Sequence, residues 1–165
     1  MTKAMNWLQK NLDSRRVFVN TLEGLDDPRN ILVTCDVGFN YLDDTKLKVF
    51  NLGVTEASSM VIASGLALSG YTVWFYSMIN FSLFRPYEMV RNAVVKHNAS
   101  VKIIGVKGGP AYKMLGFSHN LLHEDEDIKL CENIGLRSHV VQSPEQTRDI
   151  IMIEYGTPGP AYIRL

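Results

Sequence analysis

The feature that most restricts the fold of this chain is an uncharged stretch, from Ala57 to Phe84, that begins directly after Glu56. It is long enough to cross a bilayer, since about 20 apolar residues in a helix do so. However, serine, threonine, asparagine and glycine residues interrupt it throughout, and Ser69 and Gly70 form a turn signal. Neither end carries the excess of lysine and arginine that orients membrane spans. We therefore interpret the stretch as a buried helix, a turn and a buried strand.

Short apolar runs also alternate with segments of helical periodicity along the rest of the chain. Runs rich in β-branched and aromatic residues predict strands, at 30–38, 48–54, 71–77, 100–106, 138–142 and 160–165. Helical segments are predicted at 4–13, 15–25, 55–70, 85–98, 125–134 and 144–156. This alternation implies an α/β three-layer sandwich, a mostly parallel central sheet with helices on both faces. We find no repeat or linker, so we expect one domain over residues 1–165, with 1–14 as an N-terminal helical extension.

Charge and cysteine content narrow the classes of function. The 17 Lys and Arg residues balance the 17 Asp and Glu residues and form no basic stripe, which argues against nucleic acid or an acidic membrane as a partner. Cys35 and Cys131 lie far apart and outside any Cys-x-x-Cys spacing. We expect free thiols in a reducing compartment rather than a disulfide or a zinc site. The N-terminal segment lacks the apolar core of a signal peptide, so a cytoplasmic protein is predicted.

Glu56 lies where parallel α/β sheets usually bind ligands. It follows the predicted strand at 48–54 and falls in the first turn of the predicted helix at 55–70, at the carboxyl end of a strand. An acidic residue there can simply complement the helix dipole, which contributes about 0.3–1 kcal/mol. However, the helix is apolar on nearly every side, so we expect it to be interior. A carboxylate on an interior helix needs a specific partner, and both interpretations stay open from the residues alone.

Several longer segments together resemble one protein family. Residues 50–71, FNLGVTEASSMVIASGLALSGY, are similar to the transketolase segment that reads roughly Phe-Asn-x-Gly-Ile-Ala-Glu-Gln-Asn, followed by a small-residue helix. Residues 76–120 resemble the family's aromatic loop, its Arg-Asn helix and its Gly-x-Thr/Ser-His loop. Residues 31–38 look like its first strand, and residues 156–165 look like its domain ending. The likeness covers nearly the whole chain from about Arg16 onward, in order and at compatible spacing.

The part of the family that the chain resembles is the pyrimidine-binding domain of thiamine-diphosphate enzymes. In those enzymes the cofactor lies between two domains, usually from different subunits, and the other domain holds the diphosphate through a metal with a Gly-Asp-Gly motif. That motif is absent from this sequence, which also ends where transketolases continue into a C-terminal domain. The resemblance implies a stand-alone subunit without metal ligands of its own, inactive alone, whose partner, a separate diphosphate-binding subunit, holds Mg²⁺. We expect a homodimer or a hetero-oligomer.

The resemblance also implies roles for individual residues around the cofactor ring. Glu56 matches the glutamate that hydrogen-bonds a ring nitrogen of the aminopyrimidine and activates the cofactor. Phe81 matches an aromatic residue that stacks on the pyrimidine, and Phe84 falls where a second ring lines the pocket, although both can be core aromatics. Met78 can touch the ring edge or merely fill a gap. Asp36, at the end of the first strand, can support the cofactor cleft or cap a turn.

His119, in the sequence Gly-Phe-Ser-His, matches a family histidine that hydrogen-bonds the substrate or the developing alkoxide. The sequence departs from the family pattern at this point. Asn120 stands where a second histidine is common, and about three extra residues precede the Glu-Asp-Ile at 126–128. This departure leaves the substrate specificity open.

The activity implied by the resemblance is that of a transferase, which moves a short ketol or acyl unit from a ketose or keto acid to an acceptor. Two alternatives stay open: an α-keto-acid decarboxylase subunit, and a non-catalytic pyrimidine-type domain that serves as a scaffold or regulatory partner. A generic nucleotide-binding α/β domain is disfavoured because the sequence contains no Gly-x-Gly-x-x-Gly loop. The sequence does not specify the donor, the acceptor or the identity of the partner.

Overall fold

The computed structural model describes residues 3–37, 42 and 44–165, and the end of the predicted first strand, at Gly38, lies outside them. The described residues form a six-stranded sheet in the order β2-β1-β3-β4-β6-β5, with every neighbouring pair parallel. The strands are β1 (Asn30–Thr34), β2 (Lys48–Asn51), β3 (Thr72–Met78), β4 (Val101–Val106), β5 (Arg137–Val140) and β6 (Ala161–Arg164). The prediction of a mostly parallel sheet is confirmed.

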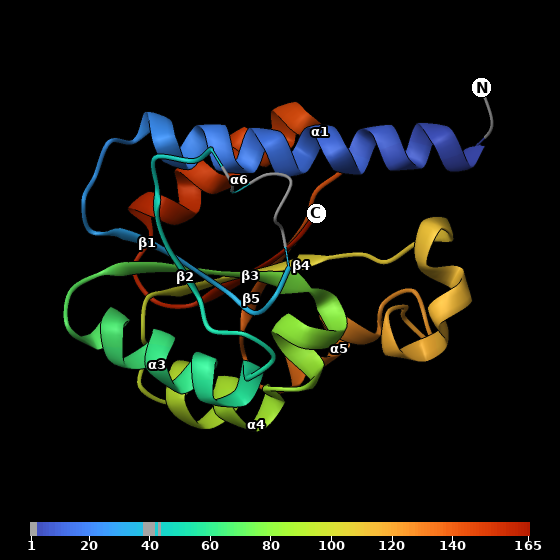
Figure 1. The fold of residues 1–165 in the computed structure, drawn as a ribbon. Coiled ribbons are helices and arrows are strands. Elements are labelled where there is room, and N and C mark those ends of the chain that lie inside the picture. The colour runs from blue at the N-terminus through green and yellow to red at the C-terminus, as the bar shows by residue number, and fades with distance from the viewer. Residues whose placement is uncertain (1–2, 38–41, 43) are drawn as a thin grey trace.

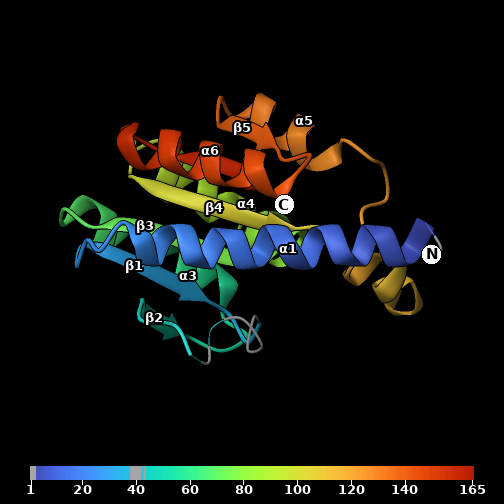
Figure 2. The same cartoon turned by 90° about the horizontal axis from the view of Figure 1, so that it is seen from above.

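Helices cover both faces of the sheet and complete the predicted three-layer sandwich (Figure 1). The helices α1 (Lys3–Gly24) and α6 (Pro144–Gly156) lie on one face, and α3 (Glu56–Leu68), α4 (Tyr87–Met89) and α5 (Glu126–Asn133) lie on the other. Seen from above, α1 crosses several strands and runs beside α6 (Figure 2). Among the described helices, none combines the length and the apolar character that a membrane crossing needs.

The central strands supply a hydrophobic core on each side of the sheet. In β3, Val73 and Phe75 point into the core under α3 and α4, whereas Trp74 and Tyr76 point into the core under α1 and α6. All four side chains are buried. A strand buried on both faces has no polar face, which explains why it reads as a continuous apolar run. The uncharged stretch is therefore the helix, turn and strand predicted from its sequence, with the turn at Gly70, where φ is +94°.

The prediction of two N-terminal helices, at 4–13 and 15–25, is wrong. The backbone continues as the single helix α1 through Ser14, whose side chain is buried. One serine weakens a helix only slightly. Burial of Phe18 and Leu22 against the sheet stabilises the helix in this region. Tertiary packing therefore outweighs the weak local signal for a break.

The helix predicted at 85–98 begins earlier than expected. A π-helical turn, η1 (Asn80–Phe84), follows β3 directly, and a second one, η2 (Val90–Val95), follows α4. In η1 the N–H of Arg85 donates to the carbonyl of Asn80, five residues back, so this turn holds one residue more than an α-helical turn. Such turns occur frequently at functional sites.

The expectation that the helix after Glu56 is interior is wrong for this chain by itself. One side of α3 packs on the sheet through Met60 and Ala63, which are fully buried. On the other side, Val61 and Ile62 are 46% and 49% exposed. Apolar residues all round a helix predict burial on every side, but the described residues cover only one side of α3.

Candidate functional site

The carboxyl ends of neighbouring strands bring the candidate residues to one edge of the sheet. β1 ends at Thr34 and its parallel neighbour β2 ends at Asn51, from which a short loop leads to Glu56 at the start of α3. β3, on the other side of β1, ends at Met78 and leads directly to Phe81 in η1. Ligand sites of parallel α/β sheets lie at this edge.

The carboxylate of Glu56 is buried and paired with Arg85. Nη1 of Arg85 donates to Oε1 of Glu56 over 2.7 Å. The same guanidinium lies over the ring of Phe81, with Cζ 4.1 Å from the ring centroid. The Glu56 side chain is 7% exposed, whereas that of Arg85 is 46% exposed. The carboxylate therefore faces a flat cation that borders solvent, and it does not point into a sealed core.

The ring of Phe81 connects this pair to His119. The two rings meet edge to face, with centroids 5.0 Å apart and planes at 84°. The imidazole is also parallel to the ring of Tyr112, at a centroid distance of 6.2 Å, and its Nδ1 lies 2.7 Å from the hydroxyl of Ser118. Through Arg85 and Phe81, the structure links Glu56 to His119, which are far apart in the sequence.

Three other predicted site residues lie near this cluster in different settings. Met78 is buried at the end of β3. Phe84 is half-buried and packs against the core on the α3 side of the sheet, as a core aromatic does. Asp36 is exposed and has φ of +57°, and its N–H donates to Oδ1 of Asn51. Its contacts are those of a turn residue after β1.

The loop between β4 and α5 (residues 107–125, the His119 loop) is built around a 3₁₀-helical segment, η3 (Pro110–Ser118), which kinks at Gly116, where φ is +63°. Asn120, which stands where the family pattern often has a second histidine, holds this helix in place. Its Nδ2 donates to the carbonyls of Tyr112 and Gly116, both over 2.8 Å. The departure from the family pattern therefore has a structural use, because the amide satisfies carbonyls that the short helix leaves open.

Two residues that sequence reasoning missed determine the position and the packing of the His119 loop. Nδ2 of Asn80 donates to the carbonyls of Phe117 and Asn120, over 2.9 and 3.3 Å. A Cβ at Gly108 would collide with the carbonyl oxygen of His119, so only glycine fits there. The signal for Asn80 was its position directly before the predicted stacking aromatic. The signal for Gly108 was its place in a Gly-Gly pair that follows the predicted strand after one residue, Lys107.

A buried polar network holds the far end of the His119 loop. Nη1 of Arg164 donates to the carbonyl of Glu124 and to Oδ1 of Asp127, over 2.8 and 2.9 Å. The hydroxyl of Tyr162 donates to Oδ2 of Asp127 over 2.7 Å. Burial, followed by the charge of Asp127, raises the pKa of Tyr162 well above its usual range, so the hydroxyl stays a donor. A Cβ at Gly105 would collide with this hydroxyl, which explains a glycine in the middle of β4.

Both cysteines are free thiols, as predicted, and both are buried. Burial raises the pKa of the Cys35 thiol, and a hydrogen bond with Ser59 offsets this only in part. Burial likewise raises the pKa of Cys131 to about 12. A thiol that stays protonated is a poor nucleophile and a poor metal ligand. Among the described residues, no group of three or more His, Cys, Asp and Glu side chains is arranged to hold a metal ion.

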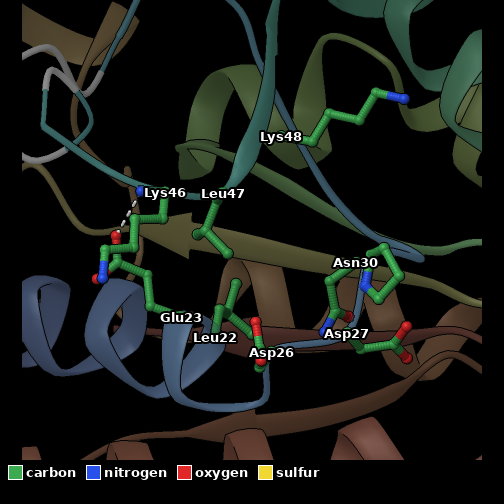
Figure 3. A pocket seen from close by; sticks show the side chains of 9 residues that line it. Leu22, Glu23, Asp26, Asp27, Asn30, Lys46, Leu47 and Lys48 are labelled. Carbon is green, nitrogen blue, oxygen red and sulfur yellow. Dashed lines mark hydrogen bonds between the residues drawn. The ribbon is translucent and has the colours of Figure 1, made fainter.

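A hollow of about 450 Å³ lies at the opposite edge of the sheet (Figure 3). Its lining includes Asn30 and Lys48, the first residues of β1 and β2. It also includes Glu23 of α1, whose Oε1 accepts a hydrogen bond from the N–H of Lys46 over 2.8 Å. Because it lies at the amino ends of the strands, this hollow is not part of the site around Glu56.

We predict that Asn80→Ala loosens the His119 loop without unfolding the protein. The change removes the donor for the carbonyls of Phe117 and Asn120, and a typical hydrogen bond contributes about 0.5–1.5 kcal/mol. Hydrogen–deuterium exchange measured by mass spectrometry should show faster amide exchange over residues 112–120. The midpoint of thermal unfolding should fall by only a few degrees.

Asn133→Ala is the matched control for this prediction. Asn133 is exposed, and its Nδ2 donates to the hydroxyl of Tyr87, away from the loop. Exchange over the His119 loop should be unchanged in this variant. Equal exchange in wild type and Asn80→Ala would show that Asn80 does not hold the loop.

The protein is a parallel α/β sandwich domain. Its candidate ligand site lies at the carboxyl ends of the strands and is built from a buried glutamate and an aromatic ring. Residues 17–165 match the family described as transketolase, pyrimidine binding domain. The chain belongs to this family, and the resemblance predicted from the sequence is confirmed.

Two curated relatives and one solved structure illustrate this membership. The chain is 32% identical over 119 residues to the B subunit of apulose-4-phosphate transketolase from Actinobacillus succinogenes, covering 72% of this chain and 37% of that protein. It is 29% identical over 159 residues to the protein of the same name from Phocaeicola vulgatus, covering 92% and 50%. The solved structure is described as a split gene transketolase, inactive beta4 tetramer, with a TM-score of 0.78, 26% identity, and coverage of 92% of this chain and 50% of that one. The chain therefore spans half or less of the length of these relatives.

Proposed function

We propose that this chain is the pyrimidine-binding subunit of a split thiamine-diphosphate-dependent enzyme of the transketolase type. The observation that carries the proposal is the buried carboxylate of Glu56. It faces a flat group that carries nitrogen atoms, the guanidinium of Arg85, which lies over the ring of Phe81. The reaction is the transfer of a short ketol or acyl unit from a small ketose or keto acid to an acceptor. Two relatives are named for apulose 4-phosphate, which favours a ketose as the donor over the decarboxylase alternative.

The residues present fit the aminopyrimidine ring of thiamine diphosphate. The guanidinium of Arg85 demonstrates that a planar group with N–H donors on its edge can contact Glu56 and Phe81 together. An aminopyrimidine likewise has a flat face, in its case aromatic, that can stack on a ring, and an edge that carries nitrogen atoms. When bound, thiamine diphosphate supplies the electron sink that lets a carbon–carbon bond beside a carbonyl break.

The chain's own residues have distinct tasks in this proposal. Glu56 shares a proton with a ring nitrogen, which it can do efficiently because its carboxylate is largely shielded from water. Phe81 fixes the plane of the ring. His119, whose imidazole is oriented by Ser118 and by the stacked Tyr112, donates a hydrogen bond to a substrate oxygen.

Three further residues support the ring site in this proposal. Met78 and Phe84 would line the pocket from the end of β3 and from η1. Asp36 would belong to its rim. Oδ1 of Asn51 accepts from the N–H groups of both Asp36 and Gly53, and this ties the turn after β1 to the loop that leads into α3.

A separate diphosphate-binding subunit completes the cofactor site in this proposal and holds its Mg²⁺. Both relatives are named as one subunit of a transketolase, the solved structure is described as a split gene transketolase, and this sequence contains no Gly-Asp-Gly motif. Exposed apolar side chains on α3 and on the His119 loop can form part of an interface with this partner. They are Val61, Ile62, Met114 and Phe117. The two free cysteines fit the cytoplasm as the compartment.

Reconstitution tests the proposed function. A chain that carries Gly-Asp-Gly with a downstream asparagine, encoded next to this one, is purified and mixed with it in the presence of thiamine diphosphate and Mg²⁺. We expect cofactor binding by isothermal titration calorimetry and ketol transfer from a ketose in a coupled assay for the mixture, and no transfer by either chain alone.

The other outcomes of this experiment are informative as well. Release of CO₂ from a keto acid without ketol transfer would identify a decarboxylase subunit. Assembly of the two chains without turnover of any donor would favour the non-catalytic scaffold. Failure of the mixture to bind thiamine diphosphate would contradict the proposal.

A further inference from the structure

Arg85 occupies the place that the proposed function gives to the cofactor ring. Its Nη1 lies 2.7 Å from Oε1 of Glu56, and its Cζ lies 4.1 Å from the centroid of the Phe81 ring. We call the pair Glu56 and Phe81 the ring seat. Within the described chain the seat is therefore filled by the side chain of the residue that directly follows η1.

A guanidinium and an aminopyrimidine share the features that the ring seat contacts. Both are flat, both are delocalised over carbon and nitrogen atoms, and both can present N–H groups from an edge. A guanidinium also pairs with carboxylates and stacks on aromatic faces, which a lysine ammonium cannot do in the same geometry. The same carboxylate oxygen and the same covered part of Phe81 cannot serve both groups at once.

We propose that Arg85 fills the ring seat until the cofactor displaces it. This inference rests on the proposed function of the site. While it is in place, the guanidinium holds the contacts of Glu56 and Phe81 that the cofactor ring would make, so the two groups compete for the seat. The charge-assisted hydrogen bond supplies the direction, and the aromatic ring supplies the plane.

Arg85 can leave the ring seat without any change in the fold. Its side chain is 46% exposed, so a rotation of the side chain alone carries the guanidinium into solvent. Its backbone is in the ordinary right-handed helical region at the end of η1, with φ of −60° and ψ of −49°. An ion pair that is open to water on one side is weak, because solvent competes for the charged groups. A ligand that makes the same contacts with more surface can therefore take its place.

Self-occupancy lowers the apparent affinity for the cofactor. When a binding site is open in only a fraction of the molecules, the apparent dissociation constant equals the intrinsic dissociation constant divided by that fraction. If the guanidinium leaves the seat empty in about one molecule in ten, removing it should tighten cofactor binding about tenfold. An arginine that helped to hold the cofactor would have the opposite effect.

Calorimetry on the assembled complex tests the displacement. Thiamine diphosphate with Mg²⁺ is titrated into the complex that contains wild type, Arg85→Ala, Arg85→Lys or the control Arg91→Ala. Arg91 is exposed and donates to Asn92 on the helix surface, outside the seat. We expect about tenfold tighter binding for Arg85→Ala, an intermediate value for Arg85→Lys, and no change for Arg91→Ala. Methylguanidinium in the millimolar range should weaken binding to Arg85→Ala and leave Arg91→Ala unaffected.

A second measurement uses the wild-type chain and does not depend on how the variants fold. The ¹⁵N–¹H resonance of the Arg85 Nε–H group should lie away from the positions of solvent-exposed arginines, because of the Phe81 ring. Binding of thiamine diphosphate in the complex should move it to the exposed position. A resonance that does not move on binding overturns the inference.

The outcomes separate this inference from the proposed function. Unchanged or weaker cofactor binding by Arg85→Ala, while wild-type binding still depends on Glu56, overturns the displacement and leaves the proposed function intact. A wild-type complex that does not bind thiamine diphosphate, or that binds it equally well after Glu56→Gln, overturns both.

Discussion

Replacement of Glu56 by glutamine is expected to lower ketol transfer by the assembled enzyme about 10²- to 10⁴-fold, the range that a positioned acid–base group contributes. Glutamine keeps the length and shape of the side chain, but its amide cannot exchange a proton with the cofactor ring. In the proposed function the carboxyl group acts on the cofactor and not on the substrate, so the loss should fall mainly on kcat. Steady-state kinetics of the reconstituted complex at saturating thiamine diphosphate measures this loss.

Two matched variants separate the chemistry of Glu56 from folding. Glu56→Asp keeps the carboxyl group but places it one methylene short of the ring, so we expect activity between those of wild type and Glu56→Gln. Glu88→Gln removes an exposed carboxylate of α4 and should keep full activity. A Glu56→Gln complex with activity within a few-fold of wild type would exclude the catalytic role and favour the non-catalytic scaffold.

The strands of this fold could be predicted from the sequence because burial on both faces leaves unbroken apolar runs. All six residues of β4 are buried, and the predicted strand differs from the observed one by a single residue. The end of β1 was less predictable. The predicted strand continues past Thr34, but the observed strand ends there, although its neighbour β3 continues to Met78. The backbone turns at Asp36, where φ is +57°, and the hydrophobic pattern does not show that turn.

The helices show a second limit of pattern reading. A π-helical turn inserts one residue into a period of 3.6, and no hydrophobic pattern in residues 80–84 marks that insertion. The apolar composition of α3 is a related case. Because nearly every position is apolar, the sequence does not indicate that Met60 faces the sheet and Val61 faces outward.

The residues of the candidate site that could be predicted from the sequence are those that match a motif of the family. Glu56, Phe81 and His119 all fall in matching segments, and in the structure His119 packs against Phe81 while Arg85 contacts both Phe81 and Glu56. Arg85 was missed as a site residue, since its contact with Glu56 joins residues 29 positions apart and no periodicity spans that distance. The useful signal was the requirement of a buried carboxylate for a partner. Arg85 is the first charged residue after the uncharged stretch that Glu56 begins.

A large effect on stability, rather than activity, is expected at Glu154 on the opposite face of the sheet. This residue of α6 is buried and receives two hydrogen bonds of 2.8 Å from Nε and Nη2 of Arg137. Nε2 of His139 lies 2.7 Å from its Oε1, and Nζ of Lys102 lies 3.3 Å from its Oε2. One carboxylate therefore joins α6 to β4 and β5.

The strength of this expectation depends on the burial of Lys102. Its side chain has no exposed surface, and its Nζ also donates to the carbonyls of Thr157 and Gly159, over 2.7 and 2.6 Å. Burial lowers the pKa of Lys102, and the nearby charge of Glu154 works against that shift. A buried ammonium that loses its counter-ion is strongly destabilising even when its other hydrogen bonds remain.

We predict that Glu154→Gln lowers the free energy of unfolding by about 3–5 kcal/mol, the usual result of breaking a buried ion pair from one side. For a domain of this size that corresponds to a midpoint lower by roughly 6–20 °C. Urea unfolding followed by circular dichroism measures the difference. Asp149→Asn, an exposed carboxylate on the same helix, should stay within about 0.5 kcal/mol of wild type.

A double-mutant cycle tests whether the pair with Lys102 causes this loss. Lys102→Met removes the buried charge, so the further change Glu154→Gln should then cost clearly less than it does in wild type. Equal losses from Glu154→Gln in both backgrounds would assign the effect to Arg137 and His139 instead. That result would contradict a dominant contribution from the buried ammonium.

The pH dependence of the same difference checks its ionic origin. Burial alone would raise the pKa of Glu154, but hydrogen bonds from Arg137 and His139 and the charge of Lys102 outweigh it and lower the pKa from 4.5 to about 2. A carboxyl group whose pKa is lower in the folded than in the unfolded state stabilises the fold fully above the unfolded value and loses this effect as the pH falls toward the folded value. The stability difference between wild type and Glu154→Gln should therefore be constant above pH 4.5 and shrink between pH 4.5 and about 2. A difference that persists unchanged to about pH 2 would mean that the shape of the side chain, and not its charge, holds β4, β5 and α6 together.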